Sequence, residues 1–167
     1  SSNFRRILSS LPIHTISDEL LLNILKRNKI SYSNIKHIIN FVKEEKKLME
    51  DILKKNIFLD EVCELSKEDF ENQSFSLSLS NDFSEEKIYY NYEEYKQHLK
   101  LTKEYERALK NYKLSISEHS TFKNIQILIN ENNWVMISKD TSPSIHFVIK
   151  HPKLRNAIEN FIPPVVE

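Results

Sequence analysis

A group of polar side chains between residues 138 and 146 contains the residue types of a hydrolytic triad. The group consists of Ser138, Asp140, Ser142, Ser144 and His146. A serine activated by a histidine that an aspartate orients can attack an acyl group. The same residue types are common in turns, because their side chains hydrogen-bond the local backbone. No oxyanion element is recognisable, so we predict no catalytic residue. A small hydrolase or nuclease that uses Asp140 and His146 is the alternative hypothesis.

Metal-binding chemistry has little support in the sequence. His146 and His151 are five residues apart across the expected end of a strand, which is not a spacing of metal ligands, and the other histidines are scattered. The stretch from His151 to Lys153 is similar to the H-x-K-x4-D motif of phospholipase D-type enzymes, but Ile158 stands where that motif has an aspartate. We therefore expect no metal ion and no cofactor.

Glycine is absent from all 167 residues, although an average chain contains about 7%. Loops that cradle phosphates need glycine for tight turns and for close approach of the backbone. The sequence therefore excludes a P-loop, a dinucleotide-binding fingerprint, a kinase-type glycine loop and the G-x-S-x-G nucleophile elbow.

Cys63 is the single cysteine, which excludes an internal disulfide and favours a reducing, cytoplasmic location. Its acidic neighbours should raise the pKa of its thiol, so it is a poor nucleophile. No apolar run approaches the roughly 20 residues that cross a bilayer, and we expect no membrane partner.

Positive charge is concentrated in the first third of the chain. Residues 1–57 contain 11 Lys or Arg against 6 Asp or Glu, whereas the net charge of the whole chain is zero. Such an excess would suit contacts with phosphates. The simpler interpretation is that these lysines form the solvated faces of amphipathic helices.

Two helices are predicted between residues 17 and 56, and we interpret residues 1–57 as a helical hairpin or arm. Ser17 is a suitable N-cap for the first helix, and Ser31 or Ser33 for the second. An apolar stripe about 27 Å long runs along the second helix, formed by Ile35, Ile38, Ile39, Val42, Met49, Ile52 and Leu53. We predict that this stripe joins two copies in a homodimer. Alternatively, it folds back on the sheet of its own chain.

A helix-turn-helix is a weaker interpretation of the same two helices. Residues 31–41 would then form the recognition helix. The predicted second helix spans about six turns, however, which is long for a helix that reads DNA.

The remaining residues are predicted to form an acidic connector at 58–73 and an α+β domain at 74–167. Apolar residues that alternate with a period of two predict strands, at 74–80, 113–117, 124–129, 134–138 and 145–150. Helices are expected over 92–112 and 152–161. The predicted fold class is therefore α+β: an N-terminal helical hairpin or arm followed by a mainly antiparallel sheet packed by two helices.

A ligand pocket is predicted on one face of the last strands. Aromatic walls with few polar groups are the usual lining of such pockets, and this face carries Trp134, Met136, Ser138 and His146.

The stretch WVMISKDTSPSIHFVIKHPKLRNAIENFI, residues 134–162, resembles the C-terminal end of helix-turn-helix transcriptional regulators from low-GC Gram-positive bacteria. The Lys-, Ile- and Asn-rich composition is similar to that of proteins from such AT-rich genomes. The resemblance implies a non-enzymatic regulatory domain that binds a small-molecule or peptide effector, or its own copy. Because the chain starts at Ser1 without a methionine, we expect it to be cut from a longer protein whose DNA-binding domain lies upstream.

Overall fold

A mixed β-sheet with helices on one face makes up most of the part of the chain that the structure describes. The computed structural model describes residues 3–8, 10–55, 57–64, 75–76, 88–117, 125–130, 134–139, 146–150 and 153. The elements follow one another as β1 (Asn3–Leu8), the 3-10 helix η1 (Ile13–Thr15), α1 (Asp18–Arg27), α2 (Tyr32–Lys54), β2 (Phe58–Glu64), β3 (Phe75–Ser76), β4 (Tyr89–Tyr90), α4 (Tyr92–Ala108), β5 (Tyr112–Ser117), β6 (Ile125–Asn130), β7 (Trp134–Lys139) and β8 (His146–Ile149).

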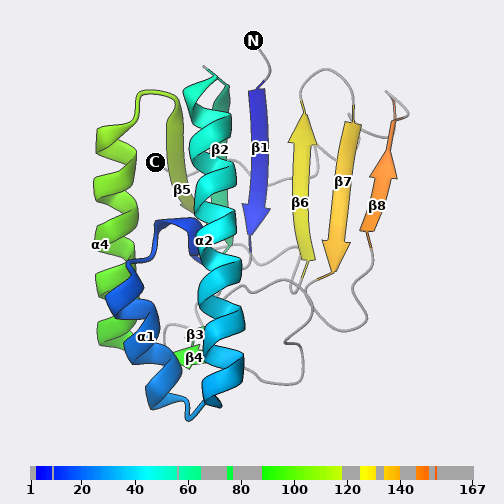
Figure 1. Cartoon of the computed structure of the whole chain (residues 1–167). Coiled ribbons are helices and arrows are strands. Elements are labelled where there is room, and N and C mark those ends of the chain that lie inside the picture. Colours follow the sequence, from blue (N-terminus) through cyan, green and yellow to red (C-terminus); the bar gives the residue numbers. More distant parts are fainter. Residues whose placement is uncertain are drawn as a thin grey trace.

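The sheet has six strands in the order β5-β2-β1-β6-β7-β8 (Figure 1). β1, β2 and β5 are parallel, and their register places Arg6 beside Glu61. β6 lies antiparallel to β1, and β6, β7 and β8 continue as antiparallel hairpins. β3 and β4 pair separately as a short two-stranded sheet.

The predicted fold class is wrong, because β1, β2 and β5 form an all-parallel three-stranded unit at the centre and one edge of the sheet. A helical arm followed by a mainly antiparallel sheet does not describe this arrangement. The reason lies in two strands that carry charges. β1, NFRRIL, contains two arginines, and β2, FLDEVCE, contains three acids, so neither has a clean alternation. Their charges are compensated only when the two strands lie side by side.

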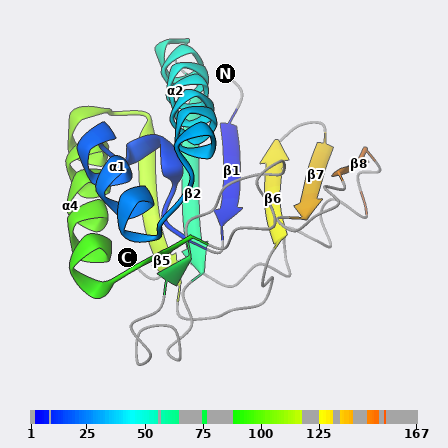
Figure 2. The same cartoon turned by 60° about the horizontal axis from the view of Figure 1, so that its bottom comes forward.

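The helices form the crossovers between the parallel strands and cover one face of the sheet. α1 and α2 connect β1 to β2, and α4 precedes β5. Figures 1 and 2 both show these helices over the parallel half, with β6, β7 and β8 extending to one side. None of the helices in the described ranges is long and apolar enough to cross a membrane.

Local sequence explains where each helix begins. The side chain of Ser17 accepts a hydrogen bond from the Leu20 amide, which confirms the predicted cap of α1. The side chain of Ser31 accepts one from the Asn34 amide, so Ser31 rather than Ser33 is the cap of α2. α4 starts with a capping box in which Asn91 and Glu94 bond each other's backbone amides.

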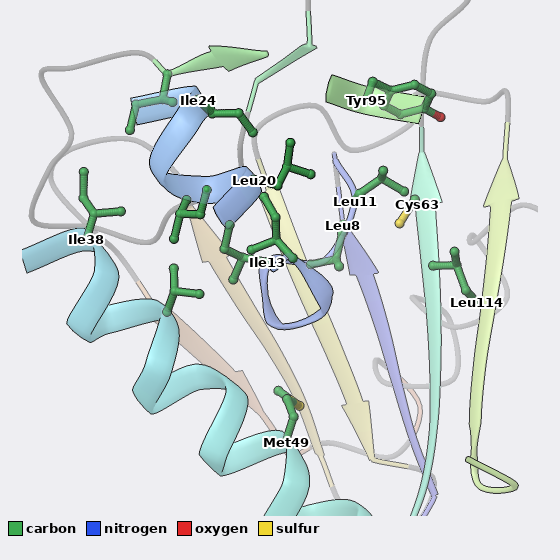
Figure 3. Packing of buried hydrophobic residues seen from close by; sticks show 14 of the residues in the cluster. Leu8, Leu11, Ile13, Leu20, Ile24, Ile38, Met49, Cys63, Tyr95 and Leu114 are labelled. Carbon is green, nitrogen blue, oxygen red and sulfur yellow. The ribbon is translucent and has the colours of Figure 1, made fainter. Parts of the chain in front are cut away.

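The apolar stripe of α2 packs into the core of its own chain (Figure 3). The buried members are Ile35, Ile38, Val42, Met49 and Leu53, while Ile39 and Ile52 are partly buried against the same cluster. They meet side chains from the sheet and from the loop after β1, such as Leu8, Leu11 and Leu59. The side chains predicted to form a dimer interface therefore cover the sheet of their own chain. This is the alternative arrangement, in which the stripe folds back on its own sheet.

The opposite face of the sheet also contains buried apolar side chains. Successive strand residues point to opposite faces, and Ile7, Val62, Ile127 and Ile129 are all buried although they alternate with the helix-facing residues. The sheet therefore carries core on both faces.

Strand positions in the second half of the sequence agree with the alternation of apolar residues. The strands predicted at 113–117, 124–129, 134–138 and 145–150 correspond to β5, β6, β7 and β8. The predicted helix 92–112 ends earlier, at Ala108. The helix predicted at 152–161 lies outside the described residues, apart from Lys153. Residues assigned to the arm, the connector and the α+β domain share one sheet through β1, β2 and β5.

Candidate functional site

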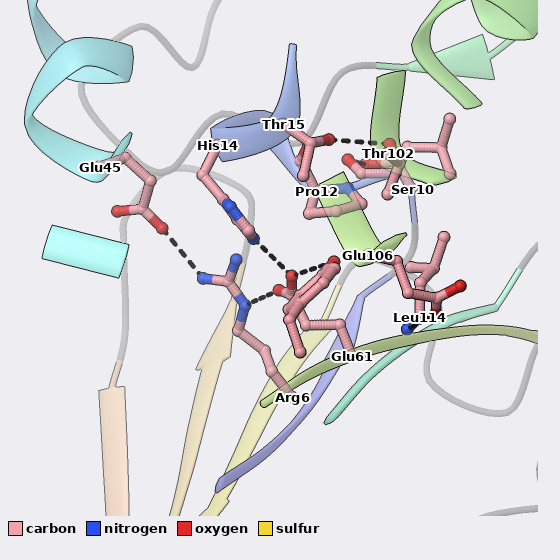
Figure 4. A network of polar contacts seen from close by, with 12 residues as sticks. Arg6, Ser10, Pro12, His14, Thr15, Glu45, Glu61, Thr102, Glu106 and Leu114 are labelled. Atoms are coloured by element: carbon pink, nitrogen blue, oxygen red, sulfur yellow. Dashed lines mark hydrogen bonds and ion pairs between the residues drawn. The ribbon is translucent and has the colours of Figure 1, made fainter. Parts of the chain in front are cut away.

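A buried cluster of charged side chains lies between the parallel strands and the helices (Figure 4). Arg6 Nε donates to Glu61 Oε2 at 2.6 Å, and its Nη1 donates to Glu45 Oε1 at 2.9 Å. The other oxygen of Glu61 accepts from His14 Nε2 at 2.5 Å and from the Tyr112 hydroxyl at 2.8 Å. Both carboxylate oxygens of Glu61 are thus occupied. We call these five residues the charged cluster.

Five different elements supply the charged cluster. The β1–β2 register sets Arg6 beside Glu61, and β5 adds Tyr112 from the neighbouring strand. η1 contributes His14 from the loop after β1, and α2 contributes Glu45 from above. The cluster therefore connects the sheet to the long helix.

Electrostatics keep Glu61 ionised inside the protein. Burial by itself disfavours the carboxylate, but the Arg6 guanidinium and the bonds from His14 and Tyr112 outweigh it and lower the pKa of Glu61 to about 2. The same carboxylates hold the pKa of Arg6 above its usual value despite burial. Burial and the Glu61 charge raise the pKa of Tyr112, so its hydroxyl remains a donor.

The centre of the charged cluster has no access to solvent, whereas the side chains of Arg6 and Glu45 at its edge are 11% and 19% exposed. The side chains of His14 and Glu61 both have 0% exposure. The His14 ring packs edge-on against Tyr105 and Tyr112, with ring centroids 5.2 and 5.6 Å away. A substrate could not reach His14 in this arrangement, so the cluster holds the fold together rather than presenting a reactive group.

A second buried cluster, made of neutral groups, lies on the α4 side of the same loop. His98 Nε2 is 2.9 Å from the Pro12 carbonyl, which it donates to, and 3.1 Å from Thr15 Oγ1. The Thr15 hydroxyl also lies 2.9 Å from the Pro12 carbonyl and 2.8 Å from the Thr102 hydroxyl, which in turn is 2.8 Å from the His98 carbonyl. The two hydroxyl protons are shared among these three contacts. We call these four residues the neutral cluster.

His98 stays uncharged in the neutral cluster. Burial is the largest cause and lowers its pKa to about 3, with further lowering from His14 and Lys46, against the opposing effect of the Pro12 carbonyl. A neutral ring with a proton on Nε2 satisfies that carbonyl.

The two clusters together hold the loop between β1 and α1. Every residue from 10 to 16 is buried, which is unusual because a buried loop must find partners for its polar groups. The charged cluster secures this loop through His14, and the neutral cluster secures it through Pro12 and Thr15. The loop is thus fixed from the α2 side and from the α4 side.

Cys63 is buried in the core beside this region. Burial, together with the Glu61 charge, raises the pKa of its thiol well above the ordinary value, as the acidic sequence context predicted. It does not behave as a nucleophile there.

A solvent-facing groove of about 300 Å³ lies between α1 and α4. Its apolar lining comes from Leu20 and Leu101. Its polar lining combines carboxylates, amides, a hydroxyl and an ammonium group, from Ser17, Glu19, Asn23, Gln97, Lys100 and Glu104. The volume is at the lower end of the range for small-molecule sites. We call it the α1–α4 groove.

The residues predicted to line a pocket lie on the outer antiparallel strands, away from both clusters in the strand order. Trp134, Met136 and Ser138 are in β7, and the β7–β8 register places the backbone of His146 opposite Ser138. Asp140 of the hydrolase hypothesis lies outside the described residues, as do the side chains of these strand residues.

Sequence reasoning missed the residues of both clusters. A usable signal was present for the charged one: Arg5-Arg6 and Asp60-Glu61 are adjacent like charges within short apolar runs. Two such runs with opposite charges can form neighbouring buried strands, because each compensates the charges of the other. The neutral cluster had no comparable signal, because threonine and histidine occur in helices and loops of every kind.

Within the described ranges, no three His, Cys, Asp or Glu side chains come together as a metal site. Comparisons with protein-family models, curated proteins and solved structures found no match.

Proposed function

We propose that this chain is a non-enzymatic regulatory domain that binds a small polar effector in the α1–α4 groove. The observation that carries the proposal is the chemistry of the groove. Glu19 and Glu104 offer carboxylates and Lys100 offers an ammonium group, and the same groove has an apolar lining from two leucines. These groups suit a compact molecule with both a positive and a negative group, such as an amino acid, or a small amine.

The position of the groove suggests how binding would be communicated. α4 presents Lys100 and Glu104 to the groove and His98 and Thr102 to the neutral cluster. Ser17, which also lines the groove, follows the fixed loop directly. A ligand that changed the distance between α1 and α4 would therefore act on the loop and, through it, on the sheet.

The wider role that we propose is in transcription regulation in the bacterial cytoplasm, as the resemblance of residues 134–162 implies. DNA would then be read by a domain outside this chain. A homodimer is part of the proposal, but it would use a surface other than the apolar face of α2, since that face lies in the core.

Thermal-shift and calorimetric titrations with a panel of amino acids and small amines test the proposal. A ligand that binds the folded state raises the melting temperature in a concentration-dependent way. Lys100→Ala and Glu104→Gln should abolish that shift, while Lys110→Ala, an exposed lysine outside the groove, should leave it unchanged.

Binding that survives both groove variants would show that the α1–α4 groove is not the site. An esterase or phosphodiesterase activity that His146→Ala abolishes would contradict the non-enzymatic proposal and favour the hydrolase alternative.

A further inference from the structure

Four lysines form a straight line along the outer face of α2. They are Lys36, Lys43, Lys47 and Lys54, and all four are exposed. Their spacings of 7, 4 and 7 residues place them within about 20° of one line on a helix that turns about 100° per residue. The line is about 27 Å long at about 1.5 Å per residue. We call it the lysine stripe.

The charges of the lysine stripe are not compensated by ion pairs within the described part of the chain. Other lysines do have such partners: Lys46 pairs with Asp18, and Lys96 pairs with Glu93. Lys43 and Lys47 are four residues apart, a spacing at which like charges disfavour a helix. The stripe therefore places four positive charges along one line of the helix.

The first turn of α2 adds to this positive potential. α1 begins with Asp18 and Glu19 and α4 with Glu93 and Glu94, whereas the first turn of α2 contains no acid. The positive end of the helix dipole is thus left uncompensated next to Lys36.

An exposed aromatic ring lies at the same end of the stripe. Tyr32 is 74% exposed, and Lys36 Nζ lies 4.9 Å from the centre of its ring. An accessible tyrosine beside a row of lysines is the combination that proteins use to bind single-stranded nucleic acid, with phosphates on the cations and a base on the ring.

We propose that the outer face of α2 binds a single-stranded nucleic acid through the lysine stripe and Tyr32. The stripe is one side chain wide and is flanked by exposed Glu44, Glu50 and Asp51. A flexible single strand can follow so narrow a line, whereas a duplex would press its second row of phosphates against these acids.

A membrane surface fits less well. A helix that lies on a bilayer buries its apolar face among the lipids. Ile38 and Val42 on the apolar face of α2 have 0% exposure because they pack in the protein core. This proposal uses a different surface from the α1–α4 groove and does not depend on the effector.

Fluorescence anisotropy with a labelled oligothymidylate of about 12 nucleotides tests the proposal on the full chain. Four phosphate contacts predict a slope of about −3 for log K against log salt concentration. Changing the four stripe lysines to glutamine should weaken binding at least tenfold and flatten this slope. A control with the same charge change, Lys26, Arg107, Lys110 and Lys150 to glutamine, alters exposed residues outside α2 and outside the α1–α4 groove and should change affinity less than threefold.

The tyrosine is tested separately. Tyr32→Ala should weaken binding about fivefold or more without changing the salt slope. The matched control is Tyr92→Ala, because Tyr92 at the start of α4 is 40% exposed and has Lys96 Nζ 4.8 Å from its ring centre. It should bind like the unmodified chain. Circular dichroism melts of all variants confirm folding, which these exposed substitutions should preserve.

Three results would overturn the proposal: no binding at low salt, equal losses in the stripe and control variants, or preferential binding to a duplex of the same length. Binding to vesicles with anionic lipids but not to the oligonucleotide would assign the stripe to a membrane instead.

Discussion

The charged and neutral clusters hold the same loop by different physical means. The charged cluster contains a guanidinium and two carboxylates, with Arg6 bonded to Glu61 and Glu45 inside the protein. The neutral cluster contains two hydroxyls, a carbonyl and the uncharged His98. Both hold the short loop between β1 and α1, and the central members of each are buried. They therefore show how charge changes the cost of breaking a buried network.

The difference concerns what remains when one member is removed. Losing Glu61 would leave a buried guanidinium without its main partner, and desolvated charge is expensive. Losing a hydroxyl from the neutral cluster would leave only uncharged groups, each of which costs far less to leave unpaired. The charged cluster is therefore the more critical of the two at neutral pH.

The largest effect is expected from Glu61→Gln. Removing this charge inside the fold should lower the free energy of unfolding by about 3–5 kcal/mol, a large part of the total of about 5–15 kcal/mol for a domain. Urea unfolding followed by circular dichroism measures it. Asp60→Asn is the control, because Asp60 pairs with a partly exposed Arg5, and it should cost less than about 1 kcal/mol. Equal losses at the two positions would contradict the comparison.

The next effect is a dependence on pH that belongs to the neutral cluster. His98 has a pKa of about 3 when folded against 6.5 when unfolded, so below pH 6.5 the unfolded chain binds a proton that the folded chain excludes. The contribution of His98 to the free energy of unfolding is fully present above pH 6.5. It should fall by about 3 kcal/mol by pH 4.5, at about 1.4 kcal/mol per pH unit. Urea unfolding at several pH values measures the free energy of unfolding as a function of pH. In His98→Gln the decrease between pH 6.5 and 4.5 that His98 causes should be absent.

The two clusters should separate along the pH axis. Glu61 has its pKa lowered from 4.5 to about 2, so its contribution is present above pH 4.5 and is lost only as pH falls through the range from 4.5 to 2. A slope between pH 6.5 and 4.5 that persists unchanged in His98→Gln would show that His98 is not its source.

A smaller loss is expected from Thr102→Val, which keeps the shape and removes the hydroxyl. The bonds to Thr15 and to the His98 carbonyl disappear, and the free energy of unfolding should fall by about 1–2 kcal/mol. The same urea experiment measures it. A loss as large as that of Glu61→Gln would mean that charge does not set the difference between the clusters.

The smallest effect is expected from Arg27→Ala. This variant tests whether burial or charge sets the size of the loss in the free energy of unfolding. Arg27 makes a two-pronged contact with Glu94 and also bonds the Tyr89 carbonyl, but its side chain is 43% exposed. The loss should be about 1 kcal/mol and should shrink as salt is added, because exposed ion pairs are screened. A loss of several kcal/mol that is independent of salt would contradict this.

Sequence patterns predicted the elements whose signals are local. Alternating residues such as Ile125, Ile127 and Ile129 indicated β6, since a period of two needs no knowledge of distant partners. Ser17 and Ser31 marked helix starts, because a cap bonds an amide three residues away. The spacing of the lysine stripe is likewise present in the sequence, although only the packing of the opposite face against the sheet shows that it points outward.

The tertiary structure decided the strand order, the parallel pairing and the composition of both clusters. β1 and β2 bring together residues that are 55 positions apart, as in Arg6 and Glu61. In each segment alone, the charged residues of β1 and β2 are typical of a linker. They fit a buried strand only because the neighbouring strand carries the opposite charges. The apolar stripe of α2 could have faced a second copy or its own sheet with the same helical period. Periodicity shows that a face must be covered, whereas only the fold determines which surface covers it.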